Sequence, residues 1–377
     1  MKLNRLPVAH AVAAAMTLLL LVHAAVADKY TEAFSKVPWQ EFPGGRFKAS
    51  TNATLSASTI AGALFQLKPG GLRELHWHDV AEWAVVIDGA CMGTATDESK
   101  LHPSDTWNFT AGDLWYFPAN VPHSIVGLGP SGCTYITGYN APDFNELTSF
   151  SASSWLATVP LATLAQALGI STAAAQRILD GNAGGKPSFI PQGSLRQMLA
   201  QAPSLPVQFP KLIHRYPLLQ NTHEVVNADG SYVNMADVTR FPVATDMSGA
   251  IVRIAPGGMR QLHWHLNFDE WQFVINGTLE VGVFTEPGQS AGGVLQPGDL
   301  GFAPRGSGHY LRNIGQQMAH VVLIFNAGLF TNVDVGNFLG TVPPAYVAAS
   351  LNISDAAARE IDYSLGGFAP AQLPPSQ

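Results

Sequence analysis

Two sets of histidine and glutamate residues are the side chains of this sequence best suited to hold a metal ion. Each set begins with the tripeptide His-Trp-His, continues with a glutamate and ends with a lone histidine further along the chain. The first set is His76, His78, Glu82 and His123, and the second set is His263, His265, Glu270 and His309. A single His-x-His is commonly an ordinary surface or core pair. Two complete sets in near-identical register indicate instead a duplicated module that binds a metal twice.

The ligand types restrict the metal and its chemistry. Three neutral imidazoles and one carboxylate carry a single negative charge, which suits a divalent cation. Because sulfur is absent from both sets, copper(I), iron–sulfur clusters and a cysteine-rich structural zinc site are disfavoured. Four protein ligands leave two positions open on an octahedral ion, enough for a small bidentate substrate or for substrate plus dioxygen. Manganese or iron is therefore expected, and the ligand types alone do not choose between them.

The residues around both sets predict short β-strands. A His-x-His on one strand points both rings to the same face, because side chains alternate along a strand. After each glutamate an apolar run leads to Asp88-Gly89 or Asn276-Gly277, and both dipeptides predict hairpin turns. Short strands separated by Gly, Pro, Asn and Asp are typical of a sandwich or closed barrel, so each metal is expected inside a barrel.

Helices are predicted only after each barrel. Helical spacing of Ala, Leu and Gln covers about 161–179, with Gly181 as a stop, and about 194–201. Near the end of the chain, 343–350 and 354–361 repeat this pattern. The stretch from Gly181 to Pro210 is rich in Gly and Pro and is the predicted linker. The predicted domains are an N-terminal domain over 28–200 and a C-terminal domain over 201–377, each a barrel with a helical extension.

Composition supports a compact β protein and excludes some partners. The 377 residues are 47% hydrophobic and 12% charged, with 36 Gly and 26 Pro, which suits a turn-rich β fold better than a helical bundle or a disordered chain. The net charge of −7 argues against nucleic acid as a partner, since phosphate binding needs a basic face. Apart from the N-terminal stretch, no segment is long and apolar enough to span a membrane.

The first 27 residues predict a secretory signal peptide. Lys2 and Arg5 precede an apolar stretch that ends in small residues at Ala25 and Ala27. The protein is therefore expected to be secreted and extracellular. Four glycosylation sequons fit this route; they begin at Asn52, Asn108, Asn276 and Asn352. Asn276 is a predicted turn residue and hence a plausible exposed acceptor. In an oxidising compartment Cys91 and Cys133 would form one disulfide, and two buried thiols are the alternative.

The motifs that carry both sets resemble those of the cupin family. The matching residues are Gly70, His76, His78, Glu82, Gly89, Gly112, Pro118 and His123 in the first half, and Gly257, His263, His265, Glu270, Gly277, Gly298, Pro304, Gly306, His309 and Asn313 in the second. The first half departs from the family at Asn120 and Gly127, which are turn and packing positions. More narrowly, the chain resembles the bicupin oxalate decarboxylases over essentially its whole length after residue 27.

This resemblance implies a fold, a reaction and an assembly. The fold is mainly β, with two cupin barrels (double-stranded β-helices of jelly-roll type) and short helical segments after each. The reaction is the manganese-dependent cleavage of oxalate to formate and carbon dioxide, with dioxygen as cofactor and one manganese per barrel. Bicupins of this type are commonly homo-oligomers, namely hexamers.

The resemblance also assigns substrate and proton-transfer residues. Arg73 and Arg260 lie three residues before each first ligand and would clamp the oxalate carboxylate. Odd spacing puts them off the ligand face of an ideal strand, so a bend at the preceding glycine pair is expected to turn them inward. Without the resemblance, each would be an ordinary strand-end arginine. Glu146 matches the glutamate of a mobile lid that protonates the product. The lid, 145–149, departs from the usual Ser-Glu-Asn-Ser-Thr, and its Leu147 replaces a polar residue.

The two sites are expected to differ in function. At the position where the family has a second buried glutamate, this chain has Leu323, and His320 is expected to face the other side of its strand. The first site is therefore expected to perform the chemistry, while the second is structural or electronic. Trp77 and Trp264 should point away from the metals and serve packing or, by resemblance, an electron path between them.

Other functions stay open from the sequence. Oxalate oxidase uses the same metal and substrate but releases carbon dioxide and hydrogen peroxide. The atypical lid keeps it as an alternative, because a loss of timely protonation would favour oxidation. A non-catalytic storage or sugar-binding bicupin would be expected to have lost metal ligands, whereas both sets are complete. A dioxygenase or isomerase acting on another small acid is a third alternative.

Overall fold

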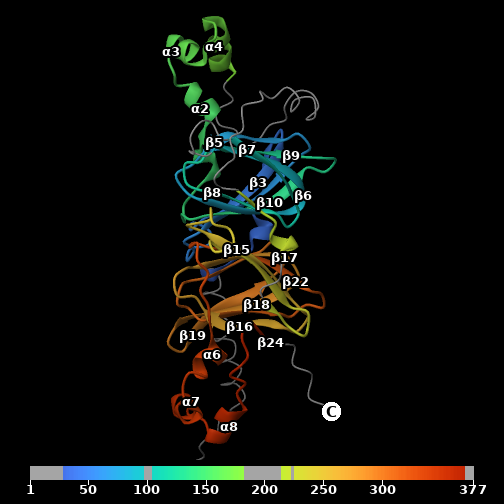
Figure 1. The fold of residues 1–377 in the computed structure, drawn as a ribbon, viewed down its shortest axis with the longest axis vertical. Coiled ribbons are helices and arrows are strands. Elements are labelled where there is room, and N and C mark those ends of the chain that lie inside the picture. The colour runs from blue at the N-terminus through green and yellow to red at the C-terminus, as the bar shows by residue number, and fades with distance from the viewer. Residues whose placement is uncertain (1–28, 97–103, 182–213, 222–224, 370–377) are drawn as a thin grey trace, which may run out of the picture.

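The computed structural model describes residues 29–96, 104–181, 214–221 and 225–369. The fold is mainly β, as predicted: two barrels follow one another along the long axis, and a helical extension stands at the outer end of each (Figure 1). The predicted signal peptide, the helix over 194–201, most of the linker and the domain boundary at 200/201 lie outside the described residues. Among the residues described, no helix is both long and apolar enough to cross a membrane.

The strands of each barrel pair antiparallel throughout. The first barrel contains β2 (Gln40–Phe42), β3 (Gly45–Ser50), β4 (Ala61–Leu67), β5 (Leu72–Trp77), β6 (Glu82–Thr96), β7 (Ser104–Thr110), β8 (Leu114–Phe117), β9 (His123–Gly127), β10 (Cys133–Tyr139) and β11 (Phe150–Ser151). The second contains β13 (Val225–Val226), β14 (Tyr232–Ala236), β15 (Ser248–Ile254), β16 (Met259–Trp264), β17 (Glu270–Asn276), β18 (Leu279–Glu286), β19 (Gln289–Leu295), β20 (Leu300–Ala303), β21 (His309–Asn313), β22 (Ala319–Phe325), β23 (Val333–Asp334) and β24 (Phe368–Ala369).

Two short strands join the barrels by crossing between them. β1 (Thr31–Glu32), at the N-terminal end of the described chain, pairs with β20 of the second barrel. β12 (Arg215–Tyr216), which precedes the second barrel, pairs with β8 of the first. Each barrel therefore has a strand from outside its own sequence segment, and the sequence pattern does not reveal this exchange.

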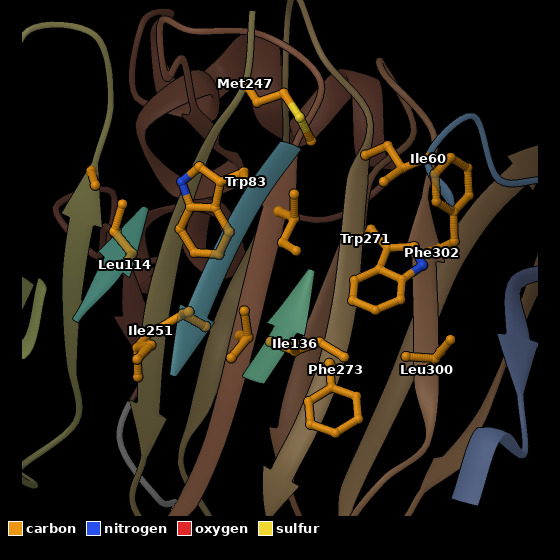
Figure 2. Close-up of a cluster of buried hydrophobic side chains, with 14 of the residues drawn as sticks. Ile60, Trp83, Leu114, Ile136, Met247, Ile251, Trp271, Phe273, Leu300 and Phe302 are labelled. Carbon is orange, nitrogen blue, oxygen red and sulfur yellow. The ribbon is translucent and has the colours of Figure 1, made fainter. Parts of the chain in front are cut away.

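A shared apolar core fills the space between the barrels. Trp83 of the first barrel packs on Gly249 of the second, where an added Cβ would lie 2.5 Å from the indole ring. Trp271 of the second barrel packs in the same way on Gly62 of the first, also at 2.5 Å. Figure 2 shows both tryptophans within this buried cluster. The two contacts are reciprocal, so a side chain at either glycine would push the barrels apart.

The predicted hairpin turns at Asp88-Gly89 and Asn276-Gly277 are wrong. β6 runs on through Gly89, pairing with β8 and β10 before it and with β7 and β9 after it. β17 and β18 likewise pair with different neighbours rather than with each other. Gly89 has φ +74° and Gly277 has φ +93°, a region that favours glycine. Both glycines therefore mark corners where the chain passes from one sheet to another.

The helices predicted over 161–179, 343–350 and 354–361 are present, the first with an interruption, and two short helices that were not predicted, α2 (Ala152–Leu156) and α6 (Val335–Leu339), precede them. The first extension contains α2, α3 (Leu161–Leu168) and α4 (Thr172–Asp180), and the second contains α6, α7 (Pro344–Leu351) and α8 (Asp355–Glu360). The single helix expected over 161–179 is two helices, because Gly169 with φ +63° ends α3 and Ser171 caps α4. Gly181 caps the end of α4, as predicted.

Cys91 on β6 and Cys133 on β10 form a disulfide, which decides between the two alternatives. Three sequon asparagines, Asn52, Asn108 and Asn352, are exposed. Asn276 is half-buried and its Nδ2 donates to the carbonyl of Met318 at 3.2 Å. The expectation of an exposed Asn276 was therefore wrong, because the residue pairs within a sheet corner. Glycosylation of the other three stays a prediction.

Candidate metal centres and active site

The structure brings each set of ligands together inside its barrel. The first set comes from β5, β6, β9 and the residue after β5, and the second from the equivalent elements β16, β17 and β21. Within each set the candidate ligand atoms lie within 4.8 Å of one another, and all eight residues are buried. The geometry matches the predicted sets, and metal binding itself stays a prediction.

The hydrogen bonds of the six histidines leave one nitrogen of each ring for a metal. Every Nδ1 lies 2.6–2.9 Å from a backbone carbonyl oxygen: Glu74 for His76, Val80 for His78, Val121 for His123, Gln261 for His263, Thr331 for His265 and Ser307 for His309. A carbonyl only accepts, so each Nδ1 carries a hydrogen and Nε2 is the nitrogen left to face a cation. His78 Nε2 and His265 Nε2 lie 3.2 and 2.9 Å from the carboxylate oxygens of Glu82 and Glu270, which are ligands of the same sets. Within the described part of the chain, His123 Nε2 and His309 Nε2 have no hydrogen-bond partner. The donor sets therefore fit a cation.

Electrostatics favour the ligand form of several of these side chains, although at His78 burial is outweighed by the Glu82 carboxylate, which raises the pKa of that imidazole. Burial lowers the pKa of His76 and of His263 well below the usual value, and the nearby Arg73 and Arg260 lower them further. Burial opposes the charge on Glu82, but His123 and His78 hold the pKa of this carboxyl well below its usual range. Neutral imidazoles and ionised carboxylates are the forms that bind a divalent ion.

In both barrels one residue from outside the ligand set donates a hydrogen bond to the ligand carboxylate, and this residue differs between the barrels. In the first barrel Trp115 Nε1 donates to Glu82 Oε1 at 2.8 Å. In the second Gln272 Nε2 donates to Glu270 Oε1, also at 2.8 Å. Trp115 pairs with Ala84 across the ladder, and at the equivalent pair Gln272 faces Gly301. The donor to the carboxylate is therefore on β8 in the first barrel and on β17 in the second, and the hydrogen bond is present in both.

Arg73 faces the metal ligands because of a β-bulge. It pairs with Ile125 of β9, while His76 pairs with His123, so two residues on β5 lie opposite one on β9 between these pairs. The extra residue returns Arg73 to the ligand face despite its odd spacing. Arg260 is turned inward by the same irregularity in β16. Both arginines are buried, as predicted, but the bulge turns them and the expected glycine bend does not.

Glu146 lies buried against Arg73 beside the first set. It begins the short 3₁₀ helix η2 (Glu146–Thr148) in the connection from β10 to β11, and only 4% of its surface is exposed. Arg73 Nη2 donates to Glu146 Oε2, and the hydroxyl of Tyr139 donates to Glu146 Oε1. Arg73 Nη2 also contacts Ser149 Oγ at 3.2 Å. The predicted acid and the predicted clamp therefore form one ion pair, and sequence reasoning missed Tyr139.

The lid segment is closed over this ion pair. Asn145 Oδ1 accepts from the amide of Leu147 at 2.9 Å and caps the 3₁₀ turn. The side chain of Leu147, which departs from the family pattern, is 47% exposed. This substitution therefore faces solvent rather than the metal ligands.

The second site holds its arginine differently. Arg260 Nη1 donates to Asp334 Oδ1 at 2.8 Å and to the carbonyl of Gly367 at 2.6 Å, and Nη2 donates to Asn332 at 2.7 Å. Asp334 belongs to β23, whose residues pair with His263 and Trp264. The expectation that this site lacks an acid was incomplete, because the sequence motif gave no sign of Asp334.

The residues opposite the second set confirm its difference from the first. Leu323 lines the same cavity as the ligands, whereas His320 is half-buried opposite Arg253. Phe325 pairs with Glu270 as Tyr139 pairs with Glu82, so a phenyl ring replaces the phenol. Among the residues that the structure describes, the second site therefore has neither the equivalent of Glu146 on a lid nor the hydroxyl that holds it.

Trp77 and Trp264 lie away from the ligands, as predicted. Trp77 stacks on Phe150 with ring centroids 5.9 Å apart and meets the edge of Trp155 at 5.8 Å. Trp264 meets Phe338 at 5.5 Å. Phe150, Trp155 and Phe338 are each more than half exposed, so both tryptophans lie beneath apolar surface at the outer ends of the barrels.

Comparison with known proteins places this architecture in a family. Residues 40–176 and 218–359 each match the Cupin family. The chain is also 34% identical over 315 residues to oxalate decarboxylase OxdC of Bacillus subtilis, covering 82% of this chain and 78% of that one. The chain belongs to the bicupin oxalate decarboxylase family. An oxalate decarboxylase of Arthroderma benhamiae is 28% identical over 351 residues, with 85% and 79% covered.

Solved structures of this family share the fold of both barrels. The structure of oxalate decarboxylase from Bacillus subtilis at pH 4.6 superimposes with a TM-score of 0.81 at 30% identity, covering 91% of this chain and 88% of that one. A further structure of the same bacterial enzyme, with the same TM-score and 89% of its chain covered, is described by its Mn(II) centres.

Proposed function

We propose that this bicupin is an oxalate decarboxylase that converts oxalate to formate and carbon dioxide at the first site, with dioxygen as cofactor. One observation carries the assignment to the first site: Glu146 and Arg73 form a buried ion pair beside the first set. The names of the relatives support oxalate as the substrate.

Both sets would hold manganese, and the Mn(II) centres of the bacterial relative support this choice over iron. When bound, manganese with dioxygen would supply the one-electron oxidation that weakens the C–C bond of oxalate. The residues of the chain then bind the substrate and manage its proton. Arg73 offers two parallel N–H groups to a carboxylate, and its Nε has no partner among the described residues.

The overall reaction requires a proton donor. The oxalate dianion becomes one formate anion and one neutral carbon dioxide, so one proton must be added to the carbon that remains. Glu146 is the carboxyl group that Arg73 and Tyr139 hold beside the first set, and we assign it this transfer. Substrate entering between Arg73 and the ligands would displace the Glu146 carboxylate from Arg73 and leave it beside the reacting carbon. Glu146 would take up the proton from a singly protonated oxalate, or from solvent before the substrate enters, and then deliver it to that carbon. The closed lid excludes water, which would otherwise compete for this position.

The second site would serve the fold or the electronic properties of the first. Its arginine is already bound by Asp334, Asn332 and Gly367, and Leu323 cannot transfer a proton. We therefore assign oxalate turnover to the first site alone, although Arg260 was also expected to bind substrate.

The location and assembly of the protein belong to the same proposal. The signal sequence at 1–27 and the exposed sequons at Asn52, Asn108 and Asn352 support a secreted glycoprotein. The exposed apolar side chains of Leu75, at 62%, and Trp155, at 60%, support a homo-oligomer in which a second copy covers them. A hexamer is the assembly that the family resemblance implies.

The test is to incubate the metal-loaded protein with oxalate under air and to measure formate and hydrogen peroxide together. Formate without stoichiometric peroxide is expected. Glu146→Ala should reduce formate production about 10²- to 10⁴-fold, the usual contribution of a general acid. Glu41→Ala is the matched control, because this carboxylate is 62% exposed. Stoichiometric peroxide without formate would instead establish oxalate oxidase, and formate production retained in Glu146→Ala would exclude the proposed role.

A further inference from the structure

The second barrel contains a cavity that oxalate does not fill. Its volume is about 370 Å³, within the range of roughly 300–1,000 Å³ typical of small-molecule sites. Three residues of the second set, His263, His265 and Glu270, line its polar end together with Arg260 and Asp334. Apolar side chains line most of the rest, among them Val233, Met235, Val252, Leu323 and Phe330. Arg240 also lines the cavity, and its charge is paired with Asp237 at 3.1 Å.

The strand ladders show why the second barrel has space where the first is filled. In the first barrel Phe47, Phe65 and Tyr135 are neighbours across β3, β4 and β10, with ring centroids 5.1 and 5.0 Å apart. At the equivalent positions of β14, β15 and β22 the second barrel has three valines, Val233, Val252 and Val321. Three aromatic rings that pack the interior of one barrel are thus replaced by small aliphatic side chains in the other.

A second row of positions changes in the same direction. Trp115 and Phe117 of β8 pair with Ala84 and Glu82. The equivalent residues of β20 are Gly301 and Ala303, which pair with Gln272 and Glu270. Gln272 occupies the space beside Gly301, where an added Cβ would lie 2.3 Å from its Oε1. The metal end therefore stays packed, and the additional volume lies along the valines.

The cavity extends well beyond the reach of oxalate. The strand order β17-β22-β15-β14 puts Val252 two strands and Val233 three strands from the strand that carries Glu270. At about 4.8 Å per strand these separations are roughly 10–15 Å. A ligand whose head reaches the second set must therefore have an apolar body to fill the remaining space.

The charges at the polar end favour a monoanion. Arg260 is neutralised by Asp334, and β23 fixes this aspartate in the sheet beside His263. A divalent metal and the Glu270 carboxylate then leave one net positive charge for the ligand. A dianion would carry one negative charge more than this end of the cavity balances while Arg260 stays paired with Asp334.

We propose that the cavity of the second barrel binds a monocarboxylic acid with an apolar body, about the size of hexanoate. Its carboxylate lies toward the second set and its hydrocarbon chain lies along Val252 and Val233. This binding does not take part in oxalate turnover. It depends on the proposed function in one respect, that the second set holds a metal.

The experiment is calorimetric titration of the manganese-loaded full chain with acetate, butyrate and hexanoate. One site per chain is expected, with affinity rising about fourfold for each added methylene group. Val252→Phe restores the ring found at Phe65 and should weaken hexanoate binding more than about tenfold, while acetate changes little. Val252→Thr keeps the side-chain shape but adds a hydroxyl group, and it should weaken hexanoate binding without filling the cavity. Val226→Phe is the control, since Val226 is 64% exposed.

Metal content and melting temperature report whether each variant is folded, and Val252→Thr decides the question if Val252→Phe does not fold. Equal affinity for acetate and hexanoate, or hexanoate binding unchanged in Val252→Thr, would overturn the proposal. A protein that converts oxalate and carries two metals but does not bind hexanoate would refute this inference alone. A protein without metal at the second set would count against the proposed function.

Discussion

Removal of the Tyr139 hydroxyl should impair proton delivery without disturbing the fold. The hydroxyl donates to Glu146 Oε1, while Arg73 contacts the other oxygen. Burial and the Glu146 charge raise the pKa of Tyr139 well above its usual value, so the phenol remains a donor throughout the neutral range. Tyr139→Phe leaves a ring of the same shape, and Phe325 occupies the equivalent position in the second barrel.

The expected loss follows from the strength of this bond. A hydrogen bond to a charged group contributes about 1.5–3 kcal/mol, which corresponds to a decrease of about 10- to 100-fold in kcat/KM if the bond positions Glu146 during proton transfer. The fraction of turnovers that end in peroxide should increase, because a carboxyl group that is poorly placed protonates its target late.

The assay measures formate and peroxide with the wild-type protein and Tyr139→Phe between acid and neutral pH. Tyr116→Phe is the matched control, since its hydroxyl lies 3.5 Å from Asp246 Oδ2 and away from Glu146. A kcat/KM within about twofold of wild type, with an unchanged peroxide fraction, would refute the positioning role.

Three further outcomes are expected. Trp115→Phe removes the donor to Glu82 and should weaken manganese binding about 10- to 100-fold at the first site only, whereas Gln272→Leu should do so at the second site only; electron paramagnetic resonance of the two centres distinguishes these cases. Replacing Cys91 and Cys133 by serine opens a loop of 42 residues and should lower the free energy of unfolding by about 4 kcal/mol, which denaturant titration measures. If a second copy covers Trp155, Trp155→Ser should reduce the mass of the assembly in light scattering. If the wild-type protein is a monomer, the substitution should leave its mass unchanged.

The sequence was sufficient for the two barrels and both ligand sets because strand alternation and motif spacing act locally. His-x-His on one strand must point both rings to one side, and the duplication repeats that constraint. The sequence pattern was less informative where one additional residue shifts the pairing register of two strands. The bulge between Arg73 and His76 is such a case, and the corners at Gly89 and Gly277 have the composition of turns although the strand continues.

Features that depend on pairs distant in sequence could not be predicted. No sequence motif indicates that β1 pairs with the second barrel and β12 with the first. The replacement of Trp115 by Gln272 as donor to the ligand carboxylate becomes visible only when the ladders are aligned in space. Asp334 and Tyr139 are ordinary residues in sequence, and only the fold places them against Arg260 and Glu146.

The most direct test of the central claim compares two variants that each remove one metal ligand. His78→Ala disrupts the first set and His265→Ala the second, and mass spectrometry should find one manganese per chain in each instead of the two expected for the intact sets. The account predicts that His265→Ala still produces formate from oxalate, while His78→Ala produces none above background. Formate production by His78→Ala, with its loss in His265→Ala, would contradict the assignment of the chemistry to the first site.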